Sequence, residues 1–460
     1  MLEEAIAHYH SLLDDARAQE SQAVLSKEMQ QRQLFFGERP LANVLRPRFI
    51  SAEQYADLAK ACALVADATR RLADEVLRTT AHAASLRRYL ALTPHEEALI
   101  AMEPGYEDPS IHSRMDTFMT LDGSSLQFVE YNAESPAAIA YEDLLSEAFL
   151  ALPVMRDFQE RYRVDILPAR HKMHETLLDA WHSVGNNDEP HVAIVDWHGL
   201  PTAHEFELFR VYFEEQGLPT IVCTPDDLTY RDGKLYASSV ATNKPLPITI
   251  VYKRILTSEF LQHYGDQVLA HPLVQAYSAG AIALVNNFRA KLLHKKSIFA
   301  LLSDERCASL FTAEQREAIA KHVPWTRLLE KTETSYQGER IDLLQFARAN
   351  RERLILKPND DYGGHGITVG WESTPDAWDA ALSEALKDHY VIQERVTVAY
   401  EDYPYLFNER LEIGQRLVDT DPFLFGNQVV GGLCRLATGA LLNVTAGGGS
   451  TVPIFVIEPK

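Results

Sequence analysis

Apolar positions recur every three to four residues through most of the first hundred residues, and this spacing predicts amphipathic helices. Ala, Leu, Glu and Arg, which favour helix, dominate these stretches. Ser51 stands just before one such run and is the expected N-cap of its helix. We therefore predict a helical N-terminal region over residues 1–100, with its clearest helices in LEEAIAHYHSLLDDARAQE and SAEQYADLAKACALVADATRRLADEVLR.

The pattern then changes, and alternating side chains predict a β-hairpin. Residues 113–136 read SRMDTFMTLDGSSLQFVEYNAESP, with Asp122-Gly123 as the expected turn between two extended runs. A helix is expected to follow directly, in AAIAYEDLLSEAFLAL. Residues 101–167 are therefore assigned to one unit that consists of a hairpin and a helix.

Short apolar runs alternate with helical segments over residues 168–288, as they do in α/β folds. The runs are rich in Val and Ile, which is typical of buried strands. The helix between the first two runs is expected to end at Gly217. The segment predicts a small parallel sheet in an α/β subdomain that shapes the substrate pocket, with strands in HVAIVDW, PTIVC, ITIVYKR and AIALVNN.

Residues 289–460 mix helical and extended patterns. A helix in RAKLLHKKSIFALLSDE is expected to carry Lys291, Lys295 and Lys296, and such a basic helix is most often a solvated face. The expected fold class of the whole chain is α/β, with α+β elements. Strands of this last part are predicted in RLILKP, YVIQERV, QVVGGLCRLA and LLNVTAG, with a helix in PDAWDAALSEALKD.

Composition narrows the class of protein. The chain has 460 residues, 46% apolar and 24% charged, which is typical of a soluble enzyme built from two or three units. A net charge of −21 argues against nucleic acid as a partner. The four scattered cysteines predict neither a zinc site nor disulfides. The N-terminus does not resemble a signal peptide and no apolar run approaches membrane-spanning length, so we expect a cytoplasmic protein without a membrane partner.

Four polar side chains interrupt the predicted hairpin. Arg114 and Asp116 are two residues apart on one strand, and Glu130 and Asn132 on the other, so each pair points to one face. Carboxylate and amide oxygens are ligands that Mg²⁺ prefers, and the helix start that follows favours phosphate. The hairpin is thus a candidate Mg²⁺ and phosphate site. The alternative is ordinary polar alternation on a half-exposed sheet.

A second candidate is the glycine-rich loop in LILKPNDDYGGHGITVGW. Lys357 ends a predicted strand, and Gly363, Gly364 and Gly366 follow it. Glycines let backbone amides approach phosphate oxygens, and a lysine offsets the phosphate charge. No GKS or GKT follows, and no helix opens at the last glycine, so this is neither a Walker A loop nor a dinucleotide fingerprint. An exposed hairpin is the alternative.

The strand predicted in YVIQERV ends in polar residues. Gln393 and Glu394 at this end can present backbone groups and a carboxylate to a base and a ribose. An edge strand that turns into solvent is the competing interpretation.

In their order along the chain, these motifs resemble the glutathionylspermidine synthetase family, whose synthetase domain has a circularly permuted ATP-grasp fold. In non-permuted ATP-grasp enzymes the metal-binding carboxylate and asparagine follow the glycine-rich loop, whereas here they precede it. The resemblance spans about residues 113–455. It rests on Arg114-x-Asp116, Glu130-x-Asn132, Lys296 in HKKSIFALL, Lys357 with its loop, Gln393-Glu394, and Arg435 in GGLCRL.

The resemblance implies ATP and two Mg²⁺ ions, and it implies a role for each matching residue. Three residues would hold the ions, two arginines would stabilise the transferring phosphoryl group, and the nucleotide would be held by the loop, two lysines and the hinge strand. Lys253, in IVYKRI, matches a lysine near the acyl substrate. The implied sets are Asp116, Glu130 and Asn132 for metal; Arg114 and Arg435 for catalysis; and Lys296, Lys357, Gly363, Gly364, Gly366, Gln393, Glu394 and Val396 for ATP.

The implied reaction joins a small-molecule carboxylate, such as a peptide, to an amine, with an acylphosphate intermediate and release of ADP. No amidase segment is expected before the synthetase-like part. Three alternatives stay open: a kinase-like phosphotransferase on the same fold, a nucleotide-binding protein without catalysis, and a plain doubly wound α/β enzyme. The last is disfavoured because residues 190–285 lack a glycine fingerprint after their first strand.

Overall fold

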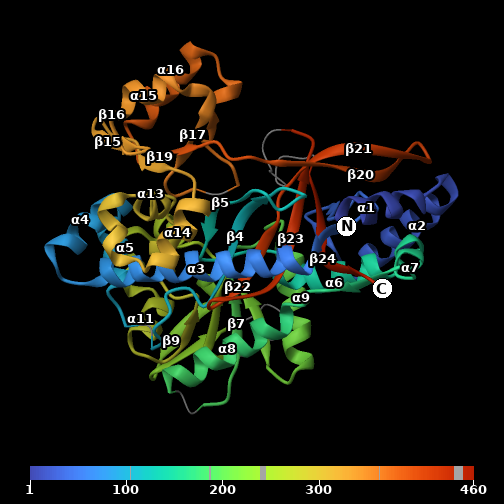
Figure 1. The fold of residues 1–460 in the computed structure, drawn as a ribbon. Helices are drawn as coiled ribbons and strands as arrows, with labels where there is room; N and C mark the ends of the chain where they lie inside the picture. The colour runs from blue at the N-terminus through green and yellow to red at the C-terminus, as the bar shows by residue number, and fades with distance from the viewer. Residues whose placement is uncertain (104, 186–187, 239–244, 362, 440–448) are drawn as a thin grey trace.

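The computed structural model describes residues 1–103, 105–185, 188–238, 245–361, 363–439 and 449–460. Figure 1 shows a central sheet with one subdomain on each side of it, a mainly antiparallel one above, in orange, and a parallel one below, in green. Helices and strands are mixed throughout, which confirms the predicted α/β class with α+β elements. None of the described helices is both long and apolar enough to cross a bilayer.

Among the described residues, the central sheet has nine strands. Their order is β20-β21-β23-β22-β4-β5, and β24 pairs with β23, β3 and β6. All pairs are antiparallel except the one between β24 and β3. The sheet therefore places the early hairpin beside the C-terminal strands. The C-terminal strands are β20 (Ala399–Phe407), β21 (Arg410–Val418), β22 (Asp421–Phe425), β23 (Gln428–Ala437) and β24 (Ser450–Pro459).

Helices dominate the first hundred residues, as predicted. Ser51 caps α3 in a capping box with Gln54, and α3 lies along the central sheet (Figure 1). The region is not a separate helical body, because the short strand β3 (Arg48–Ser51) joins the central sheet beside β24. Its other elements are α1 (Leu2–Ser11), α2 (Asp15–Gln31), β1 (Phe35–Phe36), β2 (Arg39–Pro40), α3 (Ala52–Leu77), α4 (Ala81–Leu90) and α5 (Pro94–Ile100).

The predicted hairpin is confirmed. Strands β4 (His112–Met119) and β5 (Leu126–Asn132) pair antiparallel around the Asp122-Gly123 turn, where Gly123 has a φ of +73°. The following helix α6 begins at Ile139, after a link over residues 133–138. The remaining elements of this part are α6 (Ile139–Leu150), α7 (Pro153–Phe158) and β6 (Tyr162–Asp165).

The parallel sheet is also confirmed, in the order β13-β12-β7-β8. Gly217, with a φ of +80°, follows the end of α9. A small antiparallel sheet of β9, β10 and β11 was not indicated by the sequence pattern. The elements are α8 (Arg170–Val184), β7 (Val192–Val195), α9 (Ala203–Glu215), β8 (Thr220–Cys223), β9 (Leu228–Arg231), β10 (Lys234–Ala237), β11 (Leu246–Ile248), β12 (Ile250–Lys253), α10 (Thr257–Tyr264), α11 (Pro272–Ser278) and β13 (Ala283–Val285).

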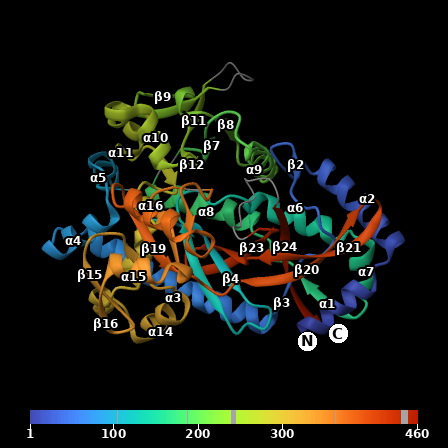
Figure 2. The same ribbon diagram turned by 90° about the horizontal axis from the view of Figure 1, so that it is seen from above.

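The antiparallel subdomain has a four-stranded sheet in the order β14-β19-β17-β18. Its own core is centred on Trp378, which is buried between two helices and the sheet. Seen from above, it lies toward one end of the central sheet, away from β21 and α2 (Figure 2). The elements are β14 (Thr326–Leu328), β15 (Glu333–Tyr336), β16 (Glu339–Asp342), α15 (Leu343–Ala349), β17 (Leu354–Pro358), β18 (Thr368–Val369), α16 (Pro375–Ala385) and β19 (Tyr390–Glu394).

The predicted basic helix is corrected by the structure. It is broken into α12 (Ala290–His294) and α13 (Ser297–Leu302), and α14 (Ala313–His322) follows. The lysines at the break are buried rather than solvated, because carboxylates from other segments surround them. The strand predicted in LLNVTAG, residues 441–447, lies outside the described residues.

Candidate active site

The hairpin places the four polar side chains opposite one another. Arg114 pairs with Asn132 and Asp116 with Glu130 in the strand register, so their side chains share one face. Arg114 Nε donates to Asp116 Oδ1 over 2.9 Å, and Asn132 Nδ2 donates to the same oxygen over 2.7 Å. The hairpin thus gathers two carboxylates, an amide and a guanidinium at one point.

The second arginine, Arg435 on β23, reaches the same carboxylate. Its Nη2 lies 2.7 Å from Asp116 Oδ2, and its Nε lies 2.7 Å from Asp419 Oδ2. Burial alone would raise the pKa of Asp116, but the guanidinium groups of Arg114 and Arg435 hold that pKa below its ordinary value. Asp116 is therefore ionised at neutral pH, bridging two arginines from strands far apart in the sequence.

Asp419 and Asp421 were missed by the sequence analysis. Asp419 accepts the backbone N–H of Arg435 over 2.5 Å, and Asp421 accepts the backbone N–H of Thr117 over 2.9 Å. Asp421 Oδ2 lies 2.9 Å from Arg435 Nη2. Burial raises the pKa of Asp421 well above its ordinary value. No spacing signal exposes these residues, because their partners lie on β4 and β23.

Two lysines face Glu130. Lys296 Nζ lies 2.9 Å from Glu130 Oε1, and Lys357 Nζ donates to Gln393 Oε1 over 2.8 Å. Burial would raise the pKa of Glu130, but the nearby lysines lower it. Burial lowers the pKa of Lys357 to about 8, and the charge of Glu130 opposes that shift. Lys357 is thus still protonated at neutral pH but loses its proton at a lower pH than an ordinary lysine.

The three glycines of the loop all adopt left-handed backbone conformations. Their φ values are +66° at Gly363, +77° at Gly364 and +67° at Gly366. A Cβ at Gly366 would lie 2.8 Å from Pro358 Cγ and 3.0 Å from the Tyr390 hydroxyl. The loop path therefore depends on glycine.

The polar end of β19 is ordered by its own contacts. Gln393 Nε2 donates to Thr326 Oγ1 over 3.1 Å. Glu394 Oε1 accepts from Arg353 Nη2 over 2.6 Å and from the Tyr336 hydroxyl over 2.8 Å. The strand end is therefore held in place next to the lysine of β17.

One cavity of about 320 Å³ connects most of these groups. Eleven of the fourteen candidate site residues that the sequence analysis named line this cavity. Lys296, Gly366 and Lys253 are not among the residues that line it, although Lys296 contacts Glu130, which does. The selected residues that line it are Arg114, Asp116, Glu130, Asn132, Lys357, Gly363, Gly364, Gln393, Glu394, Val396 and Arg435.

The oxygen donors of this cavity suit Mg²⁺. Asp116 and Glu130 supply carboxylate oxygens, and because Asn132 Nδ2 donates to Asp116, its amide oxygen is the atom that a cation can take. Within the described part of the chain, no group of three or more His, Cys, Asp or Glu side chains is arranged to hold a metal. A metal here would therefore depend on the Asn132 amide as its third protein ligand.

Lys253 is buried and does not line the cavity. Its side chain is 1% exposed, and its Nζ donates to Glu134 Oε2 over 3.2 Å and to the Ile255 carbonyl over 3.1 Å. The start of α6 also differs from expectation. Glu205 of α9 accepts from the backbone N–H of Ala138 over 2.7 Å, so a carboxylate of the protein occupies the helix start that was expected to favour phosphate.

Comparison with known proteins assigns the chain to a protein family. Residues 126–437 match the sequence model of the family described as "Circularly permuted ATP-grasp type 2". The matched range covers more than half of the chain and begins after Arg114 and Asp116, so these two residues rest on the geometry above.

Individual relatives are distant. A putative glutamate–cysteine ligase 2-3 of Frankia alni is 25% identical over 339 residues, which are 70% of this chain and 36% of that protein. An uncharacterized protein of Mycobacterium tuberculosis is 27% identical over 250 residues, 51% of this chain and 41% of that protein. The chain thus spans about two fifths or less of these curated relatives. A solved glutathione synthetase-like effector of Globodera pallida shares the fold, with a TM-score of 0.57 and 14% identity over 96% of this chain and 94% of that one.

Proposed function

This chain belongs to the circularly permuted ATP-grasp type 2 family, and from that premise we propose that it joins a carboxylate to an amine at the expense of ATP. The carboxylate attacks the γ-phosphoryl group, which yields an acylphosphate and ADP. The amine then attacks the acyl carbon, and phosphate leaves. ATP-dependent C–N ligation is the activity that this family and the named ligases support.

One observation carries the proposal. The oxygen-rich face of β4–β5 and the glycine-rich loop, more than 200 residues apart in the sequence, line the same cavity. Lys357 and Arg435 line it as well, and Lys296 contacts Glu130. Cations and hard oxygen donors around one cavity are what phosphoryl transfer from a metal–nucleotide complex needs.

We assign roles on this basis. Asp116, Glu130 and Asn132 hold two Mg²⁺ ions, which neutralise charge on the triphosphate when bound. Arg114 and Arg435 face the transferring phosphoryl group and the acyl oxygen, where negative charge develops.

The remaining residues position ATP. Lys296 and Lys357 lie along the phosphates, and Gly363, Gly364 and Gly366 cover them and exclude water from the acylphosphate. Gln393, Glu394 and Val396 meet the adenine and the ribose.

The order of the motifs along the chain narrows the class of substrates that we propose. The sequence Arg114-x-Asp116, Glu130-x-Asn132, Lys357 and Arg435 follows that of glutathionylspermidine synthetase, which supports a peptide-like carboxylate and an amine. The named relatives include a putative glutamate–cysteine ligase and a glutathione synthetase-like effector, both named for enzymes of small peptides. Short peptides and amino acids are therefore the first carboxylates to test.

The test is ADP release with Mg²⁺ and ATP across a panel of short peptides, amino acids and amines, with the product identified by mass spectrometry. We expect ADP release that requires both a carboxylate and an amine, and a product mass that shows loss of water between them. Glu130→Ala should abolish ADP release and leave the circular dichroism spectrum unchanged. Glu314→Ala, an exposed carboxylate outside the cavity lining, is the matched control. Normal turnover in the Glu130→Ala variant would overturn the metal assignment.

A phosphotransferase on the same fold is the second candidate, because the cavity geometry serves the first chemical step equally well. A stable phosphorylated product formed without an amine would favour it. An intact ATP pool with saturable nucleotide binding would instead indicate a binding protein.

A further inference from the structure

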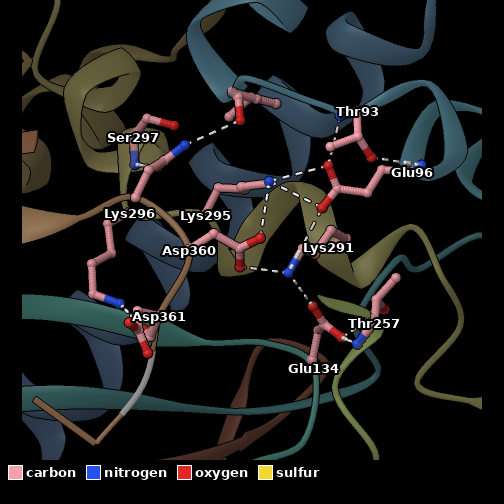
Figure 3. Close-up of polar contacts among 12 residues, drawn as sticks. Thr93, Glu96, Glu134, Thr257, Lys291, Lys295, Lys296, Ser297, Asp360 and Asp361 are labelled. Carbon is pink, nitrogen blue, oxygen red and sulfur yellow. Dashed lines mark hydrogen bonds and ion pairs between the residues drawn. The ribbon is translucent and has the colours of Figure 1, made fainter. Parts of the chain in front are cut away.

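A buried ion network connects side chains from several segments of the chain (Figure 3). It consists of the side chains of Glu96, Glu134, Lys291, Lys295 and Asp360, and four of these five are almost fully buried. None of the five lines the cavity. The proposed reaction therefore leaves this network without a role.

Lys291 is the residue of the network that connects two parts of the proposed ATP site. Its Nζ lies 2.5 Å from Asp360 Oδ1 and 3.2 Å from Glu134 Oε1, and Figure 3 shows it between these two carboxylates. Its side chain is fully buried. Burial would lower the pKa of Lys291, but Glu134 and Asp360 raise it above its ordinary value, so the ammonium stays charged.

Glu134 is the anchor on the hairpin side. It follows Asn132 by two residues, and its Oε2 accepts from the backbone N–H of Thr257 over 2.8 Å and from the Thr257 hydroxyl over 2.7 Å. Lys253 of the parallel sheet donates to the same oxygen. Glu134 therefore fixes the end of the hairpin to the parallel-sheet subdomain, which gives Lys253 a structural partner inside the protein.

Asp360 is the anchor on the loop side. It lies between Lys357 and Gly363, at the base of the glycine-rich loop. The neighbouring residue Asn359 is also fixed to the break between α12 and α13, since its carbonyl accepts from Lys296 N–H over 2.9 Å and its Oδ1 from Ser297 N–H over 2.8 Å. The base of the loop is thus fixed to the break between α12 and α13.

We propose that Lys291 is a positioning residue that sets the base of the glycine-rich loop relative to the metal-binding hairpin, through its joint contacts with Asp360 and Glu134. This inference rests on the proposed function, because it assumes that loop and hairpin close on one nucleotide. A buried ion pair is seldom the most stabilising filling of a site, and a fixed geometry between two segments is a use for which it is suited. Lys291 acts through its carboxylate partners; a third carboxylate, Glu96, lies farther from its Nζ, at 3.9 Å.

The experiment compares Lys291→Met, Asp360→Asn and the double variant by ATP kinetics and by hydrogen exchange of residues 359–370. Each single variant should raise KM for ATP about tenfold and lose the protection that Mg²⁺ with a non-hydrolysable ATP analogue gives to the loop. The double variant should show no further rise, because both changes break one link. Lys295→Met is the matched control, since Lys295 contacts Asp360 and Glu96 while the link through Lys291 remains. It should change KM less than about threefold.

Equal KM shifts in the Lys291→Met and Lys295→Met variants, or multiplying effects in the double variant, would overturn the inference. If Lys291→Met does not fold, the comparison of Asp360→Asn with Lys295→Met decides, because Asp360→Asn alters the contacts with both lysines and Lys295→Met removes only one of them. Failure of the proposed function is seen separately, as wild-type protein that binds the analogue and forms no ADP. The exchange measurement still tests the role of Lys291 in that case.

Discussion

Replacing Asp419 with asparagine should reduce ligation chemistry more than ATP binding. The two carboxylate oxygens of Asp419 accept from the backbone N–H of Arg435 over 2.5 Å and from its Nε over 2.7 Å. An asparagine keeps one acceptor oxygen and turns an NH₂ group toward the other donor. One charge-assisted hydrogen bond is lost, which costs about 1.5–3 kcal/mol of stability.

The substitution also weakens the contact between the guanidinium of Arg435 and residue 419, which lies between β21 and β22. The side chain keeps its contact with Asp116, so it stays in the cavity but in a less defined orientation. A displacement of about 1 Å in a catalytic group can cost about 100-fold in rate, so we expect kcat to fall about 10- to 100-fold. KM for ATP should change less than about threefold, because the lysines that face the phosphates are untouched.

The measurements are steady-state ADP release with saturating substrates and thermal denaturation. Asp402→Asn makes the same chemical change at an exposed position on β20 and is the control. A fall in kcat that occurs in the Asp419→Asn variant and not in the Asp402→Asn variant supports the role assigned to Arg435. Wild-type kcat together with wild-type stability in the Asp419→Asn variant would refute this role. Loss of the hydrogen bond between Asp419 and Arg435 is expected to change at least one of the two quantities.

Two further predictions follow from the loop and its lysine. Gly366→Ala should raise KM for ATP and destabilise the protein by about 1–3 kcal/mol, because Gly366 combines a positive φ with a Cβ contact of 2.8 Å. Gly233→Ala, with a φ of +75° and no atom within 4 Å of the added Cβ, measures the backbone effect alone. An equal loss of stability in both variants would exclude a contribution from the Cβ contact. Because burial lowers the pKa of Lys357 to about 8, the ammonium loses its proton above that pH. The ratio kcat/KM for ATP should therefore fall between about pH 7 and about pH 9, and Lys357→Arg should flatten this fall, whereas an identical profile in both proteins would contradict the contact with phosphate.

Local patterns identified the elements whose burial is regular. The hairpin could be predicted because polar and apolar residues alternate on both sides of Asp122-Gly123, and its register then follows from the turn. The strands of the parallel sheet could be predicted because they are short, mainly apolar runs, and β7 and β12 are buried at every position. In both cases neighbours in sequence carry the signal.

The ion pairs could not be predicted in this way. Lys291 and Lys295 have the spacing of a solvated helix face, and they are buried because Asp360 and Glu96 come to them from other segments. Asp419 likewise belongs to no periodic pattern in the sequence. It follows β21, and its partner Arg435 lies on β23. The sign and position of a charge are visible in the sequence, but whether it is solvated depends on contacts that form only in the fold.

The topology explains why these contacts form together. Strand β24, at the C-terminal end, pairs with β23, which carries Arg435, and with β3, which precedes the long helix α3. Strand β22 pairs with both β23 and β4, so it connects the strand of Arg435 to the strand of Arg114 and Asp116. Arg114 reaches Asp116 within β4, but Arg435 reaches it only when the first and last thirds of the chain have joined one sheet. The proposed site is therefore a product of the whole fold, and its chemistry depends on sheet pairing as directly as on the side chains.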